Sequence, residues 1–496
     1  MVNCIVSICI AVIFSVGSSV LYSVEAADCP SCSGDVVTIQ DVIFPAGADC
    51  ECVGTTSITA GHNVVIKKDA VVIFKAPVIN LRPGFHVEAG GFFQTIREST
   101  HIVFAWNDLG MHCLNPTYNS AVILPPYNTL WATVVQKAGK PVIVTRNLAA
   151  AYALVGNTYS YGKLSYGQFW DNAEPLFGTA LVRDTGLNLA DPEIHNALSG
   201  LMLNKTDHFQ VDGIPVVPVN DLLVWSPYQV AEVTVRDLAG SLVARTRATI
   251  PTSDDINCGK CHGSDAFNDV LSKHDTRHAT TLIVQKPVLC AKCHGSPALG
   301  SSSEGSSGIY LSQAIHGSHA GRNASCYDCH PGQTNQCNRS IAHSSPDGNC
   351  TTCHGTMAQV ALSIENKTRL PWVNEPKCIT CHAGVAEVDT GDTLYRNAKG
   401  HGNLYCAACH GSPHAMVPTT QSSDNYQAIQ YQGKAKSIGS CGACHESSKG
   451  ELDELDEFAQ KHGGTNPEKL NTCHLCHTTL LSDTTKWPHR FEWKNR

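Results

Sequence analysis

A five-residue pattern, Cys-x-x-Cys-His, recurs eight times in the second half of this 496-residue chain. Two thiols three positions apart can bind a planar cofactor covalently at two points, and the adjacent imidazole can ligate its metal from one side. At a content of 24 cysteines and 24 histidines, one copy is expected by chance only ~0.06 times. Numbered in chain order, motifs 1 to 8 are Cys258/Cys261/His262, Cys290/Cys293/His294, Cys326/Cys329/His330, Cys350/Cys353/His354, Cys378/Cys381/His382, Cys406/Cys409/His410, Cys441/Cys444/His445 and Cys473/Cys476/His477.

This pattern is the attachment signature of c-type haem. The two thiols reach the two vinyl groups of one porphyrin, and the histidine becomes the proximal ligand of the iron. A row of zinc ribbons, or of disulfides, would not require a histidine directly after every cysteine pair. The sequence therefore predicts eight covalently bound haem c groups.

The second axial ligand of each iron is predicted by counting ligand types. Met357 and Met416 are the only methionines between motif 1 and the end of the chain, so methionine cannot serve eight irons. Histidines outside the motifs are numerous enough, and they predict bis-histidine ligation at most or all haems, with low-spin iron and no vacant site. These distal candidates are His274, His278, His316, His319, His343, His401, His414, His462, His474 and His489.

The spacing of the motifs predicts an unusual core. First cysteines of successive motifs lie 24 to 36 residues apart, which leaves too little polypeptide per haem for an ordinary hydrophobic core. We expect the porphyrins to form the core, with short helical turns carrying the motifs and little other regular structure. The predicted fold is multidomain, with β-rich modules followed by a cytochrome c region: signal peptide 1–26, β-stack module 28–98, β-rich domain 99–252 and octahaem domain 253–496.

The first residues are typical of an exported protein. Cys4 to Leu21 are apolar and precede a small-residue cleavage site after Ala26, which predicts a secretory signal; an uncleaved membrane anchor is the alternative. Cys29, Cys32, Cys50 and Cys52 follow with no adjacent histidine. In an exported chain they predict two disulfides in preference to a metal site or a redox-active Cys29–Cys32 pair.

Short alternating apolar runs punctuated by Gly and Pro between residues 35 and 97 predict strands joined by tight turns. The passage from Thr55 to Thr95, above all Leu81 to Gly90, resembles the three-coathanger stack, a short β-solenoid module of exported bacterial proteins. The resemblance implies a structural or adhesive role. His62 and His86 are interpreted as turn or edge residues, not ligands.

Residues 99–252 predict a second β-rich unit, arranged as a sandwich with a few helical turns between Asn147 and Leu203. Val233 to Ala248 predicts a hairpin around an Asp-Leu-Ala-Gly turn. The run from Trp106 to Cys113 resembles a motif of exported multihaem proteins of anaerobic bacteria. We interpret it as a buried, hydrogen-bonded turn, with a metal site at His112 and Cys113 as the alternative. Cys337 is either disulfide-bonded to Cys113 or a buried thiol.

The segment from Cys258 to His477 resembles the large exported multihaem c-type cytochromes of metal-respiring and syntrophic bacteria, notably at Pro371–Cys378 and Gly400–His414. The resemblance implies electron transfer across or outside the cell envelope. Expected partners are other redox proteins as donor and acceptor, and copies of the chain itself where a head-to-tail filament forms. The alternative function is a multihaem reductase of nitrite, hydroxylamine or a sulfur oxyanion with one open haem.

Charge and hydropathy limit the remaining classes. A net charge of −8 without any basic run argues against a nucleic-acid partner. No stretch after the signal is long and apolar enough to span a bilayer. We expect an exported protein, extracellular or on the outer cell surface, otherwise periplasmic, and more an electron carrier than an enzyme.

Overall fold

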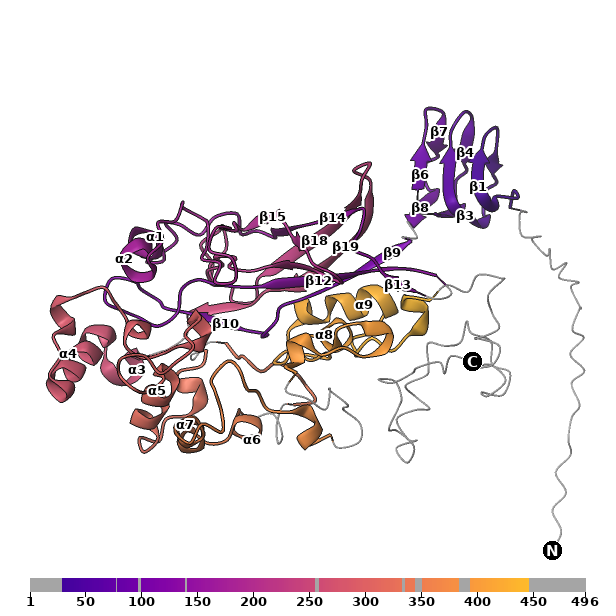
Figure 1. Cartoon of the computed structure of the whole chain (residues 1–496). Coiled ribbons are helices and arrows are strands. Elements are labelled where there is room, and N and C mark those ends of the chain that lie inside the picture. The colour runs from indigo at the N-terminus through magenta and orange to yellow at the C-terminus, as the bar shows by residue number, and fades with distance from the viewer. Residues whose placement is uncertain are drawn as a thin grey trace, which may run out of the picture. The chain divides into compact units, whose positions relative to one another are not determined.

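The computed structural model describes residues 29–76, 78–96, 100–138, 141–254, 258–331, 335–343, 350–382 and 393–445. The predicted signal segment and motif 8 lie outside this range. The described residues divide into two compact units, one before Thr100 and one from Thr100 onward, and each is described by itself. The chain is β-rich in its first half and carries short helices after it, as the sequence predicts (Figure 1).

The first unit is a small parallel β-solenoid. Each turn advances about 21 residues, because Val64 pairs with Phe85 and Val71 pairs with Phe92. One sheet has the order β1-β3-β5-β8 with β6 beside β3, and the other has the order β2-β4-β7. The strands are β1 (Ser33–Ile39), β2 (Ile43–Phe44), β3 (Asp49–Ala60), β4 (Val64–Ile66), β5 (Val71–Lys75), β6 (Val78–Leu81), β7 (Phe85–Val87) and β8 (Phe92–Ile96).

Alternation along these short strands places apolar side chains inside the solenoid. β5 alternates buried and half-buried residues, and Phe74, its fourth residue, is fully buried. Its ring lies 5.0 Å from that of Phe93 and 6.1 Å from that of Phe44, centroid to centroid. Each ring belongs to a different turn, so the aromatic column joins the turns of the solenoid. His62 and His86 lie outside it, as predicted: the His62 side chain is 76% exposed, and His86 is exposed on β7.

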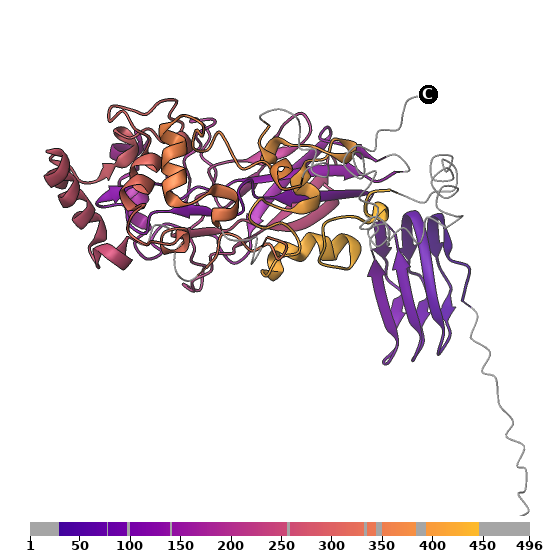
Figure 2. The ribbon, with the colours of Figure 1, turned by 90° about the horizontal axis from the view of Figure 1, so that it is seen from below.

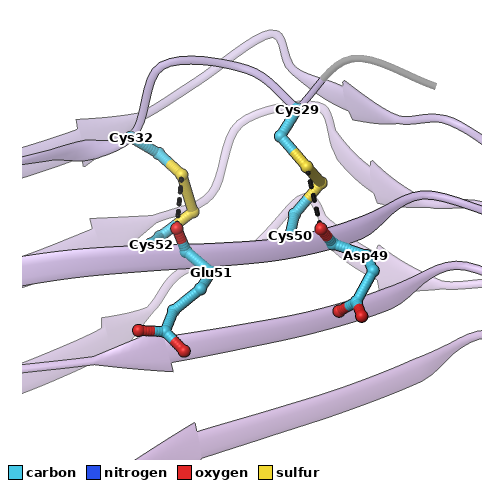
Figure 3. Close-up of a disulfide and its surroundings, with 6 residues drawn as sticks. All are labelled: Cys29, Cys32, Asp49, Cys50, Glu51 and Cys52. Atoms are coloured by element: carbon cyan, nitrogen blue, oxygen red, sulfur yellow. Dashed lines mark hydrogen bonds between the residues drawn. A yellow bond between two sulfur atoms is a disulfide. The ribbon is translucent and has the colours of Figure 1, made fainter. Parts of the chain in front are cut away.

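Two disulfides attach the start of the solenoid to β3, Cys29–Cys50 and Cys32–Cys52 (Figure 3). The prediction of two disulfides is confirmed, and the pairing crosses between segments about 20 residues apart. Cys29 and Cys32 therefore do not form a redox pair with each other.

The second unit begins with a sandwich of two antiparallel sheets that share one apolar core. One sheet has the order β13-β12-β17-β16 with β9 beside β12, and the other has the order β15-β14-β18-β19. The predicted hairpin is formed by β18 and β19. The strands are β9 (His101–Trp106), β12 (Leu130–Gln136), β13 (Val142–Ile143), β14 (Leu148–Leu154), β15 (Ser199–Leu201), β16 (Leu203–Asn204), β17 (Phe209–Val211), β18 (Val230–Asp237) and β19 (Leu242–Thr249).

Shorter elements connect the sandwich to the motif-bearing segment. β10 pairs with β20, and β11 pairs with β21, which directly precedes motif 2. The predicted helical turns between Asn147 and Leu203 are α1 and α2. Their bounds are α1 (Gly167–Asp171), α2 (Ala173–Phe177), β10 (His112–Leu114), β11 (Ala121–Val122), β20 (Thr252–Asp254) and β21 (Val288–Leu289).

β9 and β12 are buried on both faces. Val103, Ala105 and Val134 face the sandwich core, whereas Phe104, Trp106 and other residues of alternate positions pack against the motif-bearing segment. Continuous apolar runs are typical of strands covered on both sides. The sheet therefore serves two cores at once.

From residue 258 the chain forms short helices and turns along one side of the sandwich, with α4 at one end and α9 at the other (Figures 1 and 2). The helices are α3 (Gly259–His262), α4 (Ala266–His278), α5 (Leu311–His319), α6 (Cys350–His354), α7 (Met357–Glu365), α8 (Cys406–His410) and α9 (Tyr426–Gln432). The 3-10 turns are η1 (Leu282–Val284), η2 (Cys290–Lys292), η3 (Pro297–Leu299), η4 (Cys326–Asp328), η5 (Cys378–Thr380), η6 (Tyr395–Asn397), η7 (His401–Asn403), η8 (Ser422–Asn425) and η9 (Cys441–Ala443).

Among the described residues, no helix combines the length and the apolar character that a membrane crossing requires.

Candidate functional site

Each of the seven described motifs begins a short helical turn, as the sequence predicts. In motif 3 the His330 N–H donates to the Cys326 carbonyl at 2.7 Å, and motifs 1, 2 and 5 form the same bond at 2.8 to 3.0 Å. One helical turn places positions i, i+3 and i+4 on one side. Both thiols and the imidazole of a motif therefore face the same space. The turns are α3, η2, η4, α6, η5, α8 and η9.

The two cysteines of a motif differ in how far the polypeptide covers them. The first cysteines of motifs 1 to 6 are half-buried, namely Cys258, Cys290, Cys326, Cys350, Cys378 and Cys406. The second cysteines are exposed in motifs 1, 2, 4 and 5, namely Cys261, Cys293, Cys353 and Cys381, whereas Cys329, Cys409 and Cys444 of motifs 3, 6 and 7 are half-buried.

In the turns of motifs 1, 2, 4 and 5 the polypeptide covers the first cysteine more than the second. None of these thiols is in a disulfide, Cys329 included, and their covalent attachment to haem stays a prediction. Cys473 and Cys476 of motif 8 lie outside the described residues.

Six motif histidines face a second histidine that belongs to none of the motifs. The ring centroids of these six pairs are 6.0 to 6.4 Å apart. All six partners are among the ten distal candidates proposed from the sequence. The pairs, motif histidine first, are His262–His319, His294–His274, His330–His316, His354–His414, His382–His343 and His445–His401.

This separation matches one metal ion between two imidazoles. With metal–nitrogen bonds of about 2.0–2.1 Å on opposite sides, and ring nitrogens about 1.1 Å from each ring centre, the two centroids lie roughly 6.3 Å apart. Rings in direct contact would be nearer, as His274 and His278 are at 4.8 Å. The six pairs therefore fit a planar cofactor with axial imidazoles.

Helix α5 shows how the ligand nitrogens are selected. The His316 Nδ1–H donates to the Ser312 carbonyl and the His319 Nδ1–H donates to the Ile315 carbonyl, both at 2.7 Å. A carbonyl can only accept, so the proton lies on Nδ1 and the Nε2 lone pair is free for a metal. Because the two residues are three positions apart, one helix places His316 opposite the motif 3 histidine and His319 opposite the motif 1 histidine.

Motif 1 has an equivalent arrangement on the proximal side. His262 Nδ1 lies 2.6 Å from the Asp269 carboxylate of α4. Metal-ligating histidines ordinarily donate the other ring N–H to a carboxylate or carbonyl, which holds the ring and increases its basicity. Asp269 is not among the residues predicted from the sequence; its position seven residues after a motif histidine, at the start of a helix, is the signal that could have found it.

Hydroxyl groups have the same role at the second pair. His274 Nδ1 lies 2.9 Å from Thr280 Oγ1, and this hydroxyl donates its own hydrogen to Asp275. The hydroxyl oxygen is therefore left to accept from the ring. Ser307 Oγ lies 2.8 Å from His294 Nδ1 and donates to the Ile309 carbonyl in the same way.

Burial keeps several of these rings neutral. It lowers the pKa of His274, His316 and His401 below the usual histidine range. It lowers the pKa of His354 to about 4, and the neighbouring His414 adds to the effect. Neutral imidazole is the form that ligates a metal. These rings are therefore ready to bind one at neutral pH.

Contacts between motifs connect the first four in the order 2, 1, 3, 4. Cys290 of motif 2 and Cys258 of motif 1 pack against one apolar cluster around Phe267. Lys260 of motif 1 forms an ion pair with Asp328 of motif 3.

Motif 4 follows motif 3. The Cys326 thiol of motif 3 is hydrogen-bonded to Cys350 of motif 4; burial, followed by this neighbour, raises the pKa of Cys350 to about 11.

The later motifs continue this row. Burial raises the pKa of Cys353 of motif 4, and nearby Cys381 of motif 5 adds to the effect. Cys378 of motif 5, Cys406 of motif 6 and Cys444 of motif 7 all pack against the apolar cluster on the outer face of β9 and β12. Motifs 5 to 7 therefore share one surface of the sandwich.

Two buried donors mark that shared surface. Trp106 Nε1 and Trp131 Nε1 have no hydrogen-bond partner among the described residues, and both side chains belong to the cluster that holds the cysteines of motifs 5 to 7. A buried indole N–H usually has an acceptor. The carboxylates of a porphyrin are acceptors of the required kind.

The Trp106–Cys113 segment is a hydrogen-bonded turn, as predicted. His112 Nε2 lies 2.8 Å from the Asp108 carboxylate, and both side chains are buried. The described residues contain no group of three or more His, Cys, Asp and Glu side chains placed to hold a bare metal ion. Cys113 is in no disulfide, and the bonds from the Leu109 and Gly110 N–H groups to Asn107 Oδ1 support the turn interpretation.

Cys337 is also a reduced thiol and is not bonded to Cys113. Its side chain is hydrogen-bonded to the ring of His414. The charge of the Cys337 thiolate raises the pKa of His414 to about 9, and burial opposes this increase.

The remaining candidates lie elsewhere or outside the described residues. His278 lies beside His274 at the end of α4, and His410 closes α8. The distal candidates His462, His474 and His489 fall outside the described residues, as does the motif 8 histidine His477.

Comparisons with known proteins add little to this geometry. No family model and no curated protein matches the chain. Among solved structures, MtrC from Shewanella baltica OS185 aligns with 14% sequence identity over 66% of this chain and 46% of that one, with a TM-score of 0.13. This chain therefore spans less than half the length of MtrC, and a TM-score this low does not establish a shared fold.

Proposed function

We propose that this chain is an exported electron-transfer protein carrying eight covalently bound haem c groups, most of them ligated by two histidines. In this proposal the thiols of each motif hold one porphyrin and the motif histidine is its proximal ligand. The distal ligands of motifs 1 to 5 and 7 are His319, His274, His316, His414, His343 and His401 respectively. The ligand surplus predicted from the sequence leaves enough histidines for the other two motifs.

The six histidine pairs are the observation that carries this proposal. Each joins one motif histidine to one spare histidine at the separation required by an axially ligated iron. The hydrogen bonds at Nδ1 of His262, His316 and His319 support it, because they leave Nε2 as the ligand atom.

The chain sets the path for electrons. A haem iron with two axial imidazoles exchanges one electron without gaining or losing a ligand, and its potential is set by ligands, hydrogen bonds and burial. The contacts between motifs support the order 2, 1, 3, 4, 5, 6, 7 along the side of the sandwich, because Cys406 of motif 6 lies near Cys378 of motif 5 and Cys409 of motif 6 lies near Cys444 of motif 7. Motif 2 is then one end of the described row.

The test combines a haem count with a search for an open site. The purified protein should contain eight haems by pyridine haemochrome assay and intact mass, and its EPR spectrum should be low-spin. Carbon monoxide should not bind to the reduced protein, and nitrite, hydroxylamine and sulfite should not be turned over. A high-spin haem that binds these ligands and supports turnover would instead establish the reductase alternative.

Ring orientation gives the EPR experiment a second readout. His274–His294, His262–His319 and His343–His382 have interplanar angles of 71° to 81°, whereas the other three pairs have 16° to 33°. Ligand-plane angle changes the anisotropy of low-spin iron. We therefore expect two classes of low-spin signal.

We also propose that the protein is located outside the inner membrane, at the cell surface or in the periplasm. The Cys29–Cys50 and Cys32–Cys52 disulfides support this location, because such bonds persist in oxidising compartments. Fractionation of the producing cells, with haem staining of each fraction, checks the location directly. Recovery in the cytosol would contradict it.

A further inference from the structure

The loop formed by Asn107, Asp108, Leu109 and Gly110 contacts the segment that contains His414, about 300 residues later in the chain. Three of its main-chain carbonyls accept hydrogen bonds, two from the segment that contains His414 and one from Arg339. The Asn107 carbonyl accepts from Ser412 Oγ at 2.7 Å, and the Leu109 carbonyl accepts from His414 Nδ1 at 2.8 Å. The loop therefore presents a row of acceptors to one face of the motif-bearing segment.

Arg339 completes this contact from a third segment. Its Nη1 donates to the Gly110 carbonyl at 2.8 Å, and its guanidinium is held by the Asp424 carboxylate at 2.8 and 3.1 Å. The Arg339 main-chain N–H donates to the His414 carbonyl at 2.8 Å. Arg339 is buried, so the arrangement is shielded from competing water.

The shape of the loop is fixed from within. Asn107 Oδ1 accepts from the Gly110 N–H at 2.6 Å and from the Leu109 N–H at 3.1 Å, and Asn107 Nδ2 donates to Asn128. Gly110 has a φ of +89°, which favours glycine. A Cβ at this position would lie 3.1 Å from the main-chain nitrogen of His414 and 3.2 Å from the His414 Cβ. The loop is closely fitted to this histidine.

We propose that the Asn107–Gly110 loop is the positioning element of His414, holding its ring through the Leu109 carbonyl so that Nε2 faces His354 as the distal ligand of the motif 4 haem. This inference rests on the proposed function. It gives the Trp106–Cys113 segment a role in the haem chain, exerted through His414 and not by binding a metal itself.

The physical reason lies in the tautomer and orientation of the ring. The Leu109 carbonyl can only accept, so it fixes a proton on His414 Nδ1. Nε2 is then the ring atom that can bind a metal, and it loses its own proton when it does so. A main-chain carbonyl is fixed by its loop, whereas a side-chain acceptor could rotate. The ring of His414 lies 6.1 Å from that of His354, so the held orientation is the one that pairs them.

The test uses the haem-loaded full-length protein and carbon monoxide as the probe of an open haem. Gly110→Ala places a methyl group against His414, and loss of such a supporting contact weakens ligand binding about 10–100-fold. We expect the reduced variant to bind up to about one CO per chain, with a high-spin ferric EPR signal of matching size. Gly240→Ala is the matched control, since Gly240 has a φ of +82° and no atom within 4 Å of its Cβ position.

A second pair of variants removes dependence on one strained substitution. Ser412→Ala deletes the bond to the Asn107 carbonyl without adding bulk, and it should give a smaller CO-binding fraction and a shift in the potential of one haem. His414→Ala, made with Cys337→Ser so that the adjacent thiol cannot replace the ring, should bind about one CO per chain.

The outcomes separate this inference from the proposed function. A wild-type protein without covalent haem would overturn both. If the haem count is eight but the His414→Ala, Cys337→Ser protein binds no CO, His414 is not a ligand and the inference fails alone. If that protein binds CO while Gly110→Ala and Ser412→Ala behave like Gly240→Ala, the loop does not position the ring.

Discussion

The solenoid of residues 29–96 and the motif-bearing region of residues 258–445 stabilise themselves in opposite ways. The solenoid buries its own apolar side chains in one cluster and is closed by two disulfides. The motif-bearing region has short helices, and much of its buried apolar surface is shared with the sandwich through Tyr395, Tyr405, Ala407 and Ala408. The solenoid core consists of the solenoid's own side chains. The motif-bearing region packs against a sheet of the sandwich and, in our proposal, against its haem groups.

Withholding haem should have the largest effect, because the two regions should then differ most in stability. In cells that lack covalent haem attachment, residues 258–445 should lose protease resistance, because the porphyrins supply their core, while residues 29–96 stay protected. Limited proteolysis followed by mass spectrometry maps the surviving fragments. The haem-loaded protein is the control, and an apo protein that resists cleavage across 258–445 would show that the polypeptide alone folds this region.

A cavity in the solenoid should have a large but local effect. Phe74→Ala removes the centre of the aromatic column and should destabilise the solenoid by about 3–5 kcal/mol. Hydrogen exchange of peptides from residues 29–96 in the full chain measures the change. Phe92→Ala is the control, because Phe92 is 51% exposed, and equal effects of the two variants would argue against this core.

Removing a disulfide should have a smaller effect on the same unit. Cys32→Ser combined with Cys52→Ser opens a loop of about 20 residues and should cost about 2–4 kcal/mol. Hydrogen exchange should rise within residues 29–96, and the absorption spectrum of the haems should not change. A spectral change would show that the solenoid supports the haem sites.

The smallest effect is expected at Asp207, where the sandwich contacts the motif-bearing region. Lys399 forms an ion pair with this carboxylate, and the Tyr405 hydroxyl lies 3.2 Å from it. Asp207→Asn should loosen the contact by about 1–3 kcal/mol at neutral pH. Hydrogen exchange of peptides containing Lys399 and Tyr405 reports the change. Glu232→Gln is the control, because it removes a partly exposed ion pair with Arg247, of the kind that contributes at most about 1 kcal/mol.

The same carboxylate predicts a pH dependence. Burial opposes its ionisation, but the hydrogen bonds from His208 and Lys399 outweigh burial and lower the pKa of Asp207. The stability it contributes is therefore complete above the unfolded-state value of about 3.9 and is lost as pH falls through the lower folded-state pKa. The wild-type contact should hold down to about pH 4 and then weaken, and Asp207→Asn should lack this transition.

The packing of the motif-bearing segment against the sandwich corresponds to a feature of the sequence. The run from His101 to Trp106 contains five consecutive buried residues, so both of its faces are covered. A sequence read for alternation alone does not reveal what covers the second face. The predicted domain boundary at residues 252–253 stays a prediction, and the contacts across it are extensive.

Features that depend on neighbouring residues could be predicted from the sequence. The attachment motifs, their helical turns and the presence of two disulfides depend on residues a few positions apart or on the compartment, so spacing and composition predict them. The ten distal candidates also followed from counting, since methionines are too few to serve eight irons.

Only the tertiary structure decided which groups meet. His414 faces His354, although 60 residues separate them, and His343 faces His382 across motif 4. Cys29 joins Cys50 instead of Cys32. A loop near residue 110 holds a histidine at 414 through a main-chain carbonyl, a group that every residue possesses. Such contacts depend on how the whole chain packs, because long-range pairing leaves no periodic trace in the residues that form it.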